Sequence, residues 1–366
     1  MKNSVAKSLY HTYLINHFGI RRFRGGWMLT QMFVNDWKRY GKAHPFSVAK
    51  IHLKGWSYSD WKILGISNDT KDRYLSTVAY CSLHPFTGSE SSWIDDKLTL
   101  KYILHGTTLS EIMPKYYFQI ESRGKVLRLM DASDEFAEST DGIMRLLDET
   151  GRLAFKKIKA SLGEGFYSVS KDGDGYIVNG QSYSSAKLKE FFYSLSGYLV
   201  LELLRPNAYF AKYTTSSPGC LRYIIGRKLD GTIVDIYCFM RIGTKKSGTV
   251  ENFNSGGVLV IPDDNGVFNG GYVLDDSVLA SKHIDTPPDN GLPLQGVIPR
   301  WNEVKATAWK IAEQLPQLNY MGIDFVITDE DKVKILEINS LSSLDAIQLD
   351  KSILENKGGE FFKERL

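Results

Sequence analysis

The sequence predicts a mixed α+β fold, because stretches with the period of a strand are interleaved with stretches that have the period of a helix. Residues 167–178 and 321–339 each contain two short runs that alternate apolar and polar side chains around a polar loop, as in a hairpin. Apolar residues recur at helical spacing over 304–315, and residues 9–40 show mixed helical spacing without repeated strand–helix units. We therefore expect α+β lobes.

Composition and charge set modest bounds on function. The chain has 366 residues, 43% of them hydrophobic, which is enough for two or three packed lobes. Its 45 basic and 42 acidic residues give a net charge of +3, so we expect no nucleic-acid partner. No run approaches the roughly 18 apolar residues of a membrane span, and the first residues lack the apolar core of a secretion signal. We expect a cytoplasmic protein without a transmembrane segment, and the sequence leaves the oligomeric state open.

Residues 1–90 are rich in aromatic side chains and are expected to form a separate N-terminal lobe. The basic cluster at 21–24 is expected to be a solvated face or a partner contact rather than a grip on DNA. The three cysteines, Cys81, Cys220 and Cys238, are widely spaced and not grouped like metal ligands, so we expect reduced thiols.

A candidate phosphate-binding turn lies at 153–166. A strand-like run that carries several lysines enters a turn of small residues closed by Gly163 and Gly165. Glycine lets successive N–H groups approach an anion, and a lysine on the preceding strand neutralises phosphate charge. The sequence has no Gly-Lys-Ser/Thr here, so this is not a P-loop. An ordinary hairpin is the alternative interpretation of this segment taken alone.

The hairpin at 321–339 is a candidate magnesium site. If Thr328 lies opposite Val333, Asp324 lies opposite Glu337. Like charges across a strand pair repel, so the arrangement is best explained by a divalent cation between them, with Asn339 as a neutral oxygen ligand. A solvated hairpin face with ordinary acidic residues is the alternative.

Taken together, these motifs resemble the ATP-grasp superfamily, and within it the sugar-transfer-associated branch, over about residues 90 to 350. The resemblance implies an α+β ATP-grasp fold in which two lobes grip ATP, preceded by a divergent N-terminal lobe. The expected divisions are an N-terminal lobe at 1–90, a small lobe at 91–205, a large lobe at 206–350 and a tail at 351–366.

The resemblance also assigns nucleotide-binding roles. Lys97, in the Asp-Lys segment 93–98, corresponds to the first nucleotide lysine, and Lys156 to the second. The proline that usually follows the second lysine is replaced by Lys157, which leaves Lys156, Lys157 and Lys159 as candidates. Strand alternation places Lys156 on one face and Lys157 with Lys159 on the other. Adenine is expected at the hinge, bound chiefly by backbone groups. The expected ATP-binding set is Lys97, Lys156, Ser161, Gly163, Gly165, Glu202, Leu203 and Leu204.

The remaining family positions concern catalysis and the acceptor. Arg222 and Arg241 are retained, and two guanidinium groups suit a reaction that spreads negative charge over a phosphoryl group and an acyl phosphate. Glu251 stands where the family has Asp before an Asn. A loop histidine can also be a simple hydrogen-bonding residue. The expected substrate-side set is Asn252, Gly256, Gly257, His283 and Trp301.

The resemblance implies an ATP-dependent carboxylate–amine ligase that uses one or two Mg²⁺ ions held by Asp324, Glu337 and Asn339. The expected substrates are a carboxylated sugar or glycan precursor and an amine, in bacterial surface polysaccharide synthesis. Two alternatives stay open: an ATP-grasp-type kinase that phosphorylates a hydroxyl, and a non-catalytic protein that binds a glycan or a partner.

Overall fold

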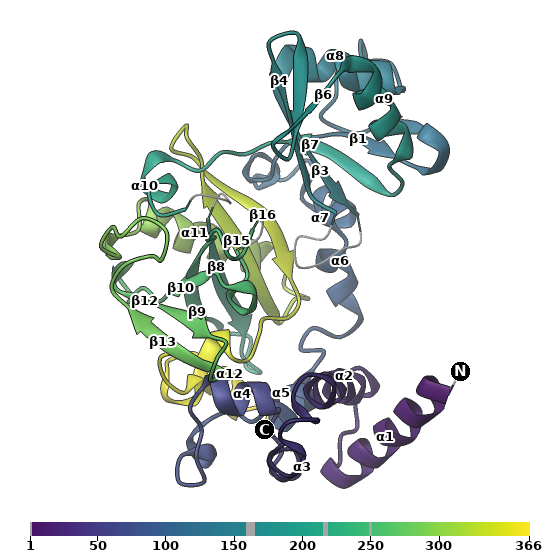
Figure 1. Ribbon diagram of the computed structural model, residues 1–366. Coiled ribbons are helices and arrows are strands. Elements are labelled where there is room, and N and C mark those ends of the chain that lie inside the picture. The colour runs from purple at the N-terminus through teal and green to yellow at the C-terminus, as the bar shows by residue number, and fades with distance from the viewer. Residues whose placement is uncertain (1, 159–164, 215–218, 249–250) are drawn as a thin grey trace. The chain divides into compact units, whose positions relative to one another are not determined.

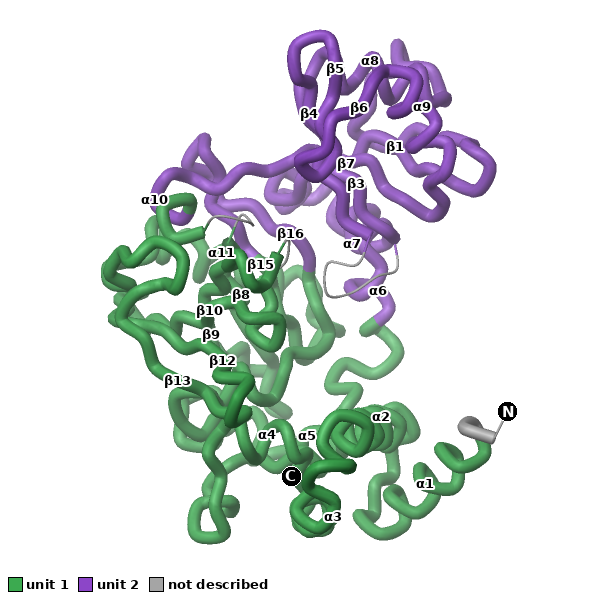
Figure 2. Tube along the Cα trace, in the orientation of Figure 1, with its two compact units in different colours: residues 1–91, 211–324, 338–366 green, residues 92–210, 325–337 purple. Residues whose placement is uncertain are grey.

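The computed structural model describes residues 2–158, 165–214, 219–248 and 251–366 (Figure 1). The chain divides into two compact units (Figure 2). Unit 1 contains residues 1–91, 211–324 and 338–366, and unit 2 contains residues 92–210 and 325–337. The divisions expected near residues 90 and 205 lie close to two of these breaks, whereas residues 1–90, expected as a lobe of their own, cluster with unit 1.

Two of the helices at the start of unit 1 have serine N-caps. Ser57 accepts from the Asp60 N–H and Ser76 from the Ala79 N–H, which starts the fourth and fifth helices. Asp36 is buried and bonds to the His52 ring nitrogen (3.0 Å) and to the Tyr58 N–H (2.6 Å), so it joins three helices. The helices are α1 (Lys2–Phe18), α2 (Phe23–Tyr40), α3 (Pro45–Leu53), α4 (Tyr58–Ile63) and α5 (Thr77–Leu83).

A seven-stranded sheet with the order β13-β12-β10-β9-β8-β15-β16 follows. Its last two strands, β15 and β16, carry the chain into unit 2 and back, since residues 325–337 belong to that unit. The strands are β8 (Cys220–Arg227), β9 (Ile233–Ile242), β10 (Val258–Val260), β12 (Gly271–Asp275), β13 (Ala280–Ile284), β15 (Tyr320–Ile327) and β16 (Val333–Asn339). A two-stranded sheet, β11 (Val267–Asn269) with β14 (Gln295–Val297), and helices α11 (Trp301–Gln314) and α12 (Gly359–Lys363) complete the unit.

The core of unit 1 explains why the N-terminal residues join it. Phe86 stacks on Tyr320 of β15 at 4.7 Å between ring centroids and also contacts Phe361 of α12. The Tyr80 hydroxyl donates to the Ser342 carbonyl (2.6 Å). The tail expected at 351–366 is therefore part of this core, because both phenylalanines of α12 are fully buried.

Unit 2 has a second seven-stranded sheet, with the order β2-β1-β7-β3-β4-β5-β6. Its core forms where helices α8 and α9 cover the sheet, with Phe155 stacked on Phe192 at 4.8 Å. Helix α8 ends at Gly151, whose φ of 72° is the left-handed geometry that glycine tolerates best. The strands are β1 (Tyr116–Ile120), β2 (Val126–Arg128), β3 (Arg152–Lys157), β4 (Tyr167–Asp172), β5 (Gly175–Val178), β6 (Gln181–Tyr183) and β7 (Tyr198–Glu202). The helices are α6 (Ser92–Asp95), α7 (Lys97–Leu104), α8 (Thr140–Thr150), α9 (Ser185–Ser194) and α10 (Ala208–Ala211).

Both predicted hairpins are present, and one has a different register. Strands β4 and β5 pair as expected, with Asp172 opposite Gly175. In the other loop the Thr328 N–H donates to the Lys332 carbonyl (2.9 Å) and the Asp331 N–H to the Thr328 carbonyl (2.8 Å), with Asp331 at a φ of 57°. Thr328 therefore lies opposite Lys332, and the prediction that it lies opposite Val333 was wrong by one residue. The argument that this register places Asp324 opposite Glu337 loses its basis.

A buried acid, Asp60, makes the stability of unit 1 depend on pH. Its carboxylate accepts from the Thr77 hydroxyl (2.7 Å). Burial and the charge of the buried Asp345 raise the pKa of Asp60 to about 7, although hydroxyl groups oppose the shift. An unfolded aspartate has a pKa of about 3.9. The folded state thus binds the proton more tightly, and the stability that this gives is complete below about pH 4 and is lost as the pH rises through 7.

We therefore predict that the native chain loses stability between about pH 4 and pH 8, and that the Asp60→Asn variant lacks most of this loss. The decline caused by this group has an upper limit of about 4 kcal/mol, from a shift of about three units. Urea unfolding at several pH values measures it, with the exposed Asp69→Asn as the matched control. An equal decline in Asp60→Asn and in the native chain would contradict the assignment.

Candidate active site

The most distinctive charged cluster in unit 1 surrounds Asp324, which is only 2% exposed on β15. Arg222 of β8 donates from Nε to Oδ1 and from Nη2 to Oδ2 (2.7 Å). Arg241 of β9 donates from Nη2 to Oδ2 (2.8 Å). One buried carboxylate thus holds two guanidinium groups, one of them through a two-point contact.

The charges in this cluster are mutually dependent. Burial would raise the pKa of Asp324, but Arg222 and Arg241 outweigh it and hold the pKa below its usual value. Arg241 also donates from Nη2 to the Cys220 sulfur (2.7 Å). Burial nevertheless raises the pKa of the Cys220 thiol well above its ordinary value, so this cysteine is a protonated thiol and not a nucleophilic thiolate.

A loop that carries predicted substrate residues lies next to Arg241. Glu251 approaches the Arg241 Nε to 4.0 Å. Asn252 begins a short turn and accepts from the Asn254 N–H (3.2 Å). A Cβ on Gly257 would lie 2.6 Å from the Glu251 carbonyl oxygen, and Gly256 has a φ of 100°. Both glycines are therefore required by the backbone of the loop itself.

In unit 2 the structure brings together two predicted site residues that lie far apart in the sequence. The Lys97 ammonium is 3.5 Å from a Glu337 carboxylate oxygen. Lys97 is the first residue of α7, which Asp96 caps by accepting from the Leu98 and Thr99 N–H groups. The lysine is mostly buried and the glutamate is about 29% exposed, so the pair is partly screened by solvent.

A second lysine of α7, Lys101, was missed by the sequence analysis. It is buried and pairs with Asp131 (2.8 Å), donates to the Pro114 carbonyl (3.1 Å) and lies near the Tyr116 ring. It follows Lys97 by four residues and therefore lies on the same side of the helix. A pair of lysines at that spacing in an otherwise apolar helix was the signal that could have identified it.

The two candidate phosphate lysines of β3 point to opposite faces of the sheet. Lys157 lies opposite Tyr198 on the face that the helices cover, and Lys156 lies opposite Leu199 on the other face. The Lys157 side chain approaches Gly165, because a Cβ there would be 3.0 Å from its carbons. Ser161, Gly163 and Lys159 lie outside the described residues, so the predicted phosphate loop is represented only by Gly165.

The predicted adenine segment follows β7. The Glu202 N–H donates to the Lys115 carbonyl (2.9 Å), and the Glu202 side chain accepts from the Lys115 N–H (3.0 Å). Leu203 and Leu204 are half-buried, and their backbone groups make none of the hydrogen bonds found among the described residues. Beyond them, the Asn207 N–H donates to the Ile327 carbonyl, which fixes the end of the segment.

The last two predicted substrate residues have different environments. His283 of β13 is about half exposed, contacts the Tyr272 ring at 5.3 Å and is 3.8 Å from Asp285. Trp301 is buried at the start of α11, donates from Nε1 to the Asp264 carbonyl (2.9 Å) and covers Gly266. These contacts are those of a core residue that fixes the start of a helix.

Asn339 is half-buried at the end of β16. Within the described ranges, no group of three or more His, Cys, Asp or Glu side chains is placed to hold a metal ion. Asp324, one of the three predicted ligands, is occupied by arginines.

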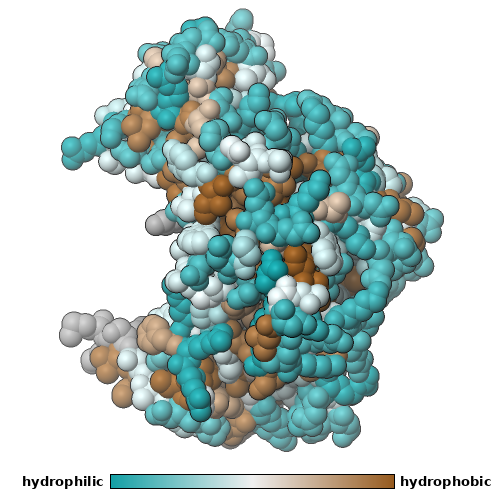
Figure 3. All heavy atoms as spheres, turned by 180° about the vertical axis from the view of Figure 1, so that it is seen from behind, coloured by the Kyte–Doolittle hydropathy of each residue, from teal (hydrophilic) through white to brown (hydrophobic). Residues whose placement is uncertain are grey.

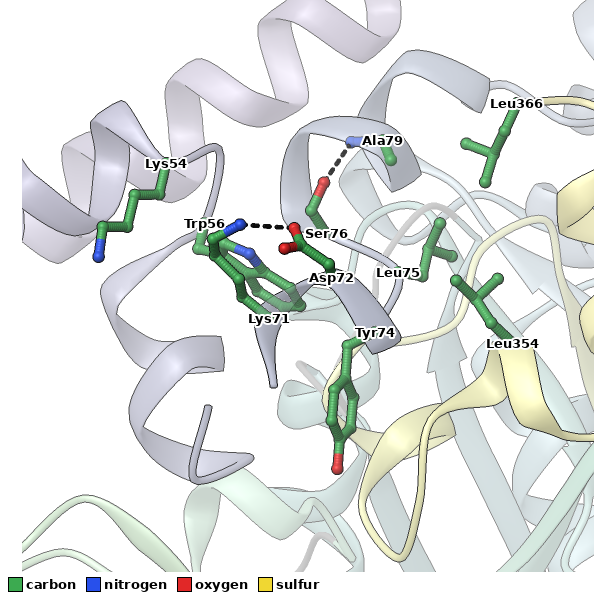
Figure 4. A pocket seen from close by; sticks show the side chains of 10 residues that line it. All are labelled: Lys54, Trp56, Lys71, Asp72, Tyr74, Leu75, Ser76, Ala79, Leu354 and Leu366. Carbon is green, nitrogen blue, oxygen red and sulfur yellow. Dashed lines mark hydrogen bonds and ion pairs between the residues drawn. The ribbon is translucent and has the colours of Figure 1, made fainter. Parts of the chain in front are cut away.

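A separate hollow of about 290 Å³ lies in unit 1 (Figure 4). Trp56, Tyr74 and Leu354 are among its lining residues, and its rim includes the Lys71–Asp72 contact. None of the predicted site residues lines this hollow.

One known protein family matches this chain. A family model described as sugar-transfer associated ATP-grasp matches residues 83–358. No curated protein matches the sequence.

Several solved structures are also similar. D-alanyl-alanine synthetase A from Vibrio cholerae is 14% identical, with 76% of this chain and 65% of that chain covered and a TM-score of 0.39. Carboxyaminoimidazole ribonucleotide synthase from Aspergillus clavatus, complexed with ATP, is 11% identical (69% and 46% covered, TM-score 0.39). L-amino acid ligase from Bacillus licheniformis is 10% identical (74% and 46% covered, TM-score 0.38). The chain spans less than two thirds of each of these proteins, and similarities this weak carry no argument about its activity.

We predict that Asp324→Asn destabilises unit 1 by about 3–5 kcal/mol, because it leaves the buried Arg222 and the partly buried Arg241 without their shared carboxylate. Asp276→Asn is the matched control, since it breaks an exposed ion pair with Lys246 and should cost at most about 1 kcal/mol. Urea unfolding measures both. Equal small losses would show that the cluster is not a structural requirement.

Proposed function

Because the chain belongs to the sugar-transfer associated ATP-grasp family, we propose that it is an ATP-dependent ligase that joins a carboxylate to an amine. ATP would supply the phosphoryl group that activates the carboxylate as an acyl phosphate. The observation that best supports this proposal is the buried cluster of Arg222, Asp324 and Arg241. Two guanidinium groups that a buried carboxylate holds in place are suited to stabilising an anion that forms during the reaction.

We assign roles to the two arginines on the basis of their contacts. Arg222 uses Nε and Nη2 for Asp324, and its Nη1 makes none of the hydrogen bonds found among the described residues. We assign to Arg222 and Arg241 the stabilisation of negative charge on the acyl phosphate and its tetrahedral successor. Because Asp324 fixes both side chains before substrate binds, little reorganisation is needed when that charge develops.

We assign phosphate binding to Lys97 and Lys156, and adenine recognition to the backbone of Glu202–Leu204. Lys156 lies on the face of β3 opposite to the one that α8 and α9 cover, and for this reason we prefer it to Lys157. The backbone groups of Leu203 and Leu204 are suited to an adenine edge, because they are not used within the described parts of the fold. Asn252, Gly256, Gly257 and His283 are kept as acceptor-side candidates, and Trp301 as a residue that positions this region.

The donor set of Asp324, Glu337 and Asn339 suits Mg²⁺, because carboxylate and amide oxygens are the ligands that this ion prefers. Bound Mg²⁺ would neutralise phosphate charge. Asp324 already satisfies two arginines, so a cation there would compete with them for its oxygens. Glu337 is more exposed than Asp324, and its side chain forms an ion pair with Lys97.

We further propose that the carboxylate belongs to a sugar or a glycan precursor, on the basis of the family description, and that the reaction takes place where ATP is made, in the cytoplasm. An ATP-grasp-type kinase is the second candidate. It would use the same lysines, metal ligands and arginines, and only the product separates the two reactions.

We predict that Glu337→Gln weakens the binding of a non-hydrolysable ATP analogue with magnesium by about tenfold or more, because even groups that only support a metal ligand are worth that much. Glu330→Gln, on the loop of the same hairpin, is the control, since it changes an exposed glutamate that pairs with Lys332. Calorimetric titration compares the three proteins. If both variants bind like the native chain, Glu337 is not part of the nucleotide site.

The ligase proposal is tested by trapping the activated carboxylate. Hydroxylamine attacks the acyl carbon, forms a C–N bond and releases inorganic phosphate, so a ligase should accumulate a hydroxamate with ATP and a uronic acid even without the natural amine. A kinase would release ADP and form a phosphoester that hydroxylamine leaves intact. ADP release with a sugar hydroxyl and no hydroxamate across uronic acids would replace the ligase proposal by the kinase.

A further inference from the structure

The charge of the chain is distributed very unevenly. Residues 2–54 contain ten lysines and arginines but a single acid, Asp36, whereas the remainder of the chain carries a net charge of −6. Asp36 is buried and hydrogen-bonded to His52. Every exposed charge on the described side chains of this N-terminal segment is therefore positive.

These positive charges are not neutralised by neighbouring acids. Among the residues described from Lys7 to Lys54, no lysine or arginine forms an ion pair. Arg22 donates to the Pro85 carbonyl (3.1 Å) and Arg24 to the Ser91 hydroxyl (3.1 Å), which are neutral acceptors. The segment thus presents an uncompensated basic surface, to which exposed side chains contribute at 21, 22, 24, 38, 39, 42 and 50.

Helix α1 has an apolar row on its outer side as well as on its packed side. Val5, Leu9 and Tyr13 follow one another at intervals of four residues, so they form one row along the helix. They are 60%, 68% and 50% exposed. His11 and Leu14, on the opposite side of the helix, are buried. The outer row therefore plays no part in holding α1 on the rest of unit 1.

Exposed apolar side chains continue on the next two helices. Phe23 at the start of α2 is exposed and lies 5.5 Å from the His11 ring of α1. On α3, Phe46 and Leu53 are exposed with Lys50 between them, at spacings that place all three on one side of the helix. Figure 3 shows hydrophobic atoms at the lower left of the view, where the turn from Figure 1 brings α1. Single exposed apolar residues are ordinary, but a row bordered by cations indicates a binding surface.

We propose that the helical segment 2–54 docks on the surface of an anionic lipid bilayer. The α1 row would enter the interfacial region of the bilayer, and the surrounding lysines and arginines would contact the lipid phosphates. Within the described residues no helix is long and apolar enough to cross a membrane, so the segment would lie along the surface.

Charge and chemistry favour this partner over two others. A second copy of the segment would bring the same positive charges together, which repel. Nucleic acid would satisfy the cations, but its phosphate backbone offers nothing to aliphatic side chains such as Val5 and Leu9. Only a surface with both anionic groups and an accessible apolar layer accounts for both observations.

The test is flotation of the purified chain with vesicles. We expect binding to phosphatidylcholine vesicles that contain phosphatidylglycerol, little binding to phosphatidylcholine alone, and weaker binding as salt rises. The double change Val5→Glu, Leu9→Glu should reduce binding by about tenfold or more, since it puts carboxylates in the apolar layer. The matched control is Leu229→Glu, Val278→Glu, because these positions are 69% and 57% exposed on unit 1 and lie outside the segment.

Four results would overturn the proposal. The first is no binding to the anionic vesicles, and the second is an equal loss of binding in both double variants. The third is a native dimer in light scattering that becomes a monomer only in the Val5, Leu9 variant, which would assign the row to a second copy. Tight binding to single-stranded RNA that the Val5, Leu9 change leaves unaltered, without vesicle binding, would assign the basic surface to nucleic acid. Circular dichroism of both variants establishes that they are folded.

Discussion

The burial of the Asp324 carboxylate is the constraint on which the candidate site depends. A carboxylate that is 2% exposed must be paired, because an isolated charge in the interior costs far more than a fold can supply. Its two partners come from β8 and β9, so the ion pairs require these strands to bring Arg222 and Arg241 to β15. The orientation of the guanidinium groups is thus determined by folding, before any substrate is present. Such preorganisation is what electrostatic stabilisation of a developing anion needs.

The same constraint separates the roles of the acidic residues. Asp324 forms ion pairs with both arginines, so a substitution of Asp324 would alter the stability of the fold and the chemistry of the site together. Glu337 is expected to contribute less to stability, because it is partly exposed and its ion pair with Lys97 is partly screened by solvent. Loss of function on changing Asp324 is therefore ambiguous, whereas loss on changing Glu337 is a more direct test of the proposed nucleotide site. The difference between Asp324 and Glu337 arises from their burial. It could not be predicted from the sequence, where each acid simply follows a hydrophobic residue of a strand.

Local patterns allowed much of the fold to be predicted, and non-local contacts were mostly missed. The helix at 301–314 and the β4–β5 hairpin follow from periodicity, which neighbouring residues determine. The register of the β15–β16 hairpin was predicted wrongly, because Asp331 adopts a left-handed conformation that the sequence pattern does not predict. The sequence analysis singled out Arg222, Arg241 and Asp324, but it did not predict that the two arginines contact Asp324. The contact of Lys97 with Glu337 joins residues too far apart in sequence for any local signal to reveal it.

The net charge of the whole chain conceals the basic surface of the N-terminal segment. A net charge of +3 argued against a strong electrostatic field, yet it is the difference between a basic segment and an acidic remainder. Folding does not account for the apolar row of α1. The helix is already held by its packed side, where His11 bonds to Thr30 (3.0 Å) and a Cβ on Gly26 would lie 2.4 Å from an Ile15 methyl group. This close packing holds α1 in place without any contribution from apolar residues on its outer side. Because Leu9 is exposed to water, the free energy that its burial would contribute is not gained. The row is therefore better explained by a partner surface that covers it than by the stability of the chain alone.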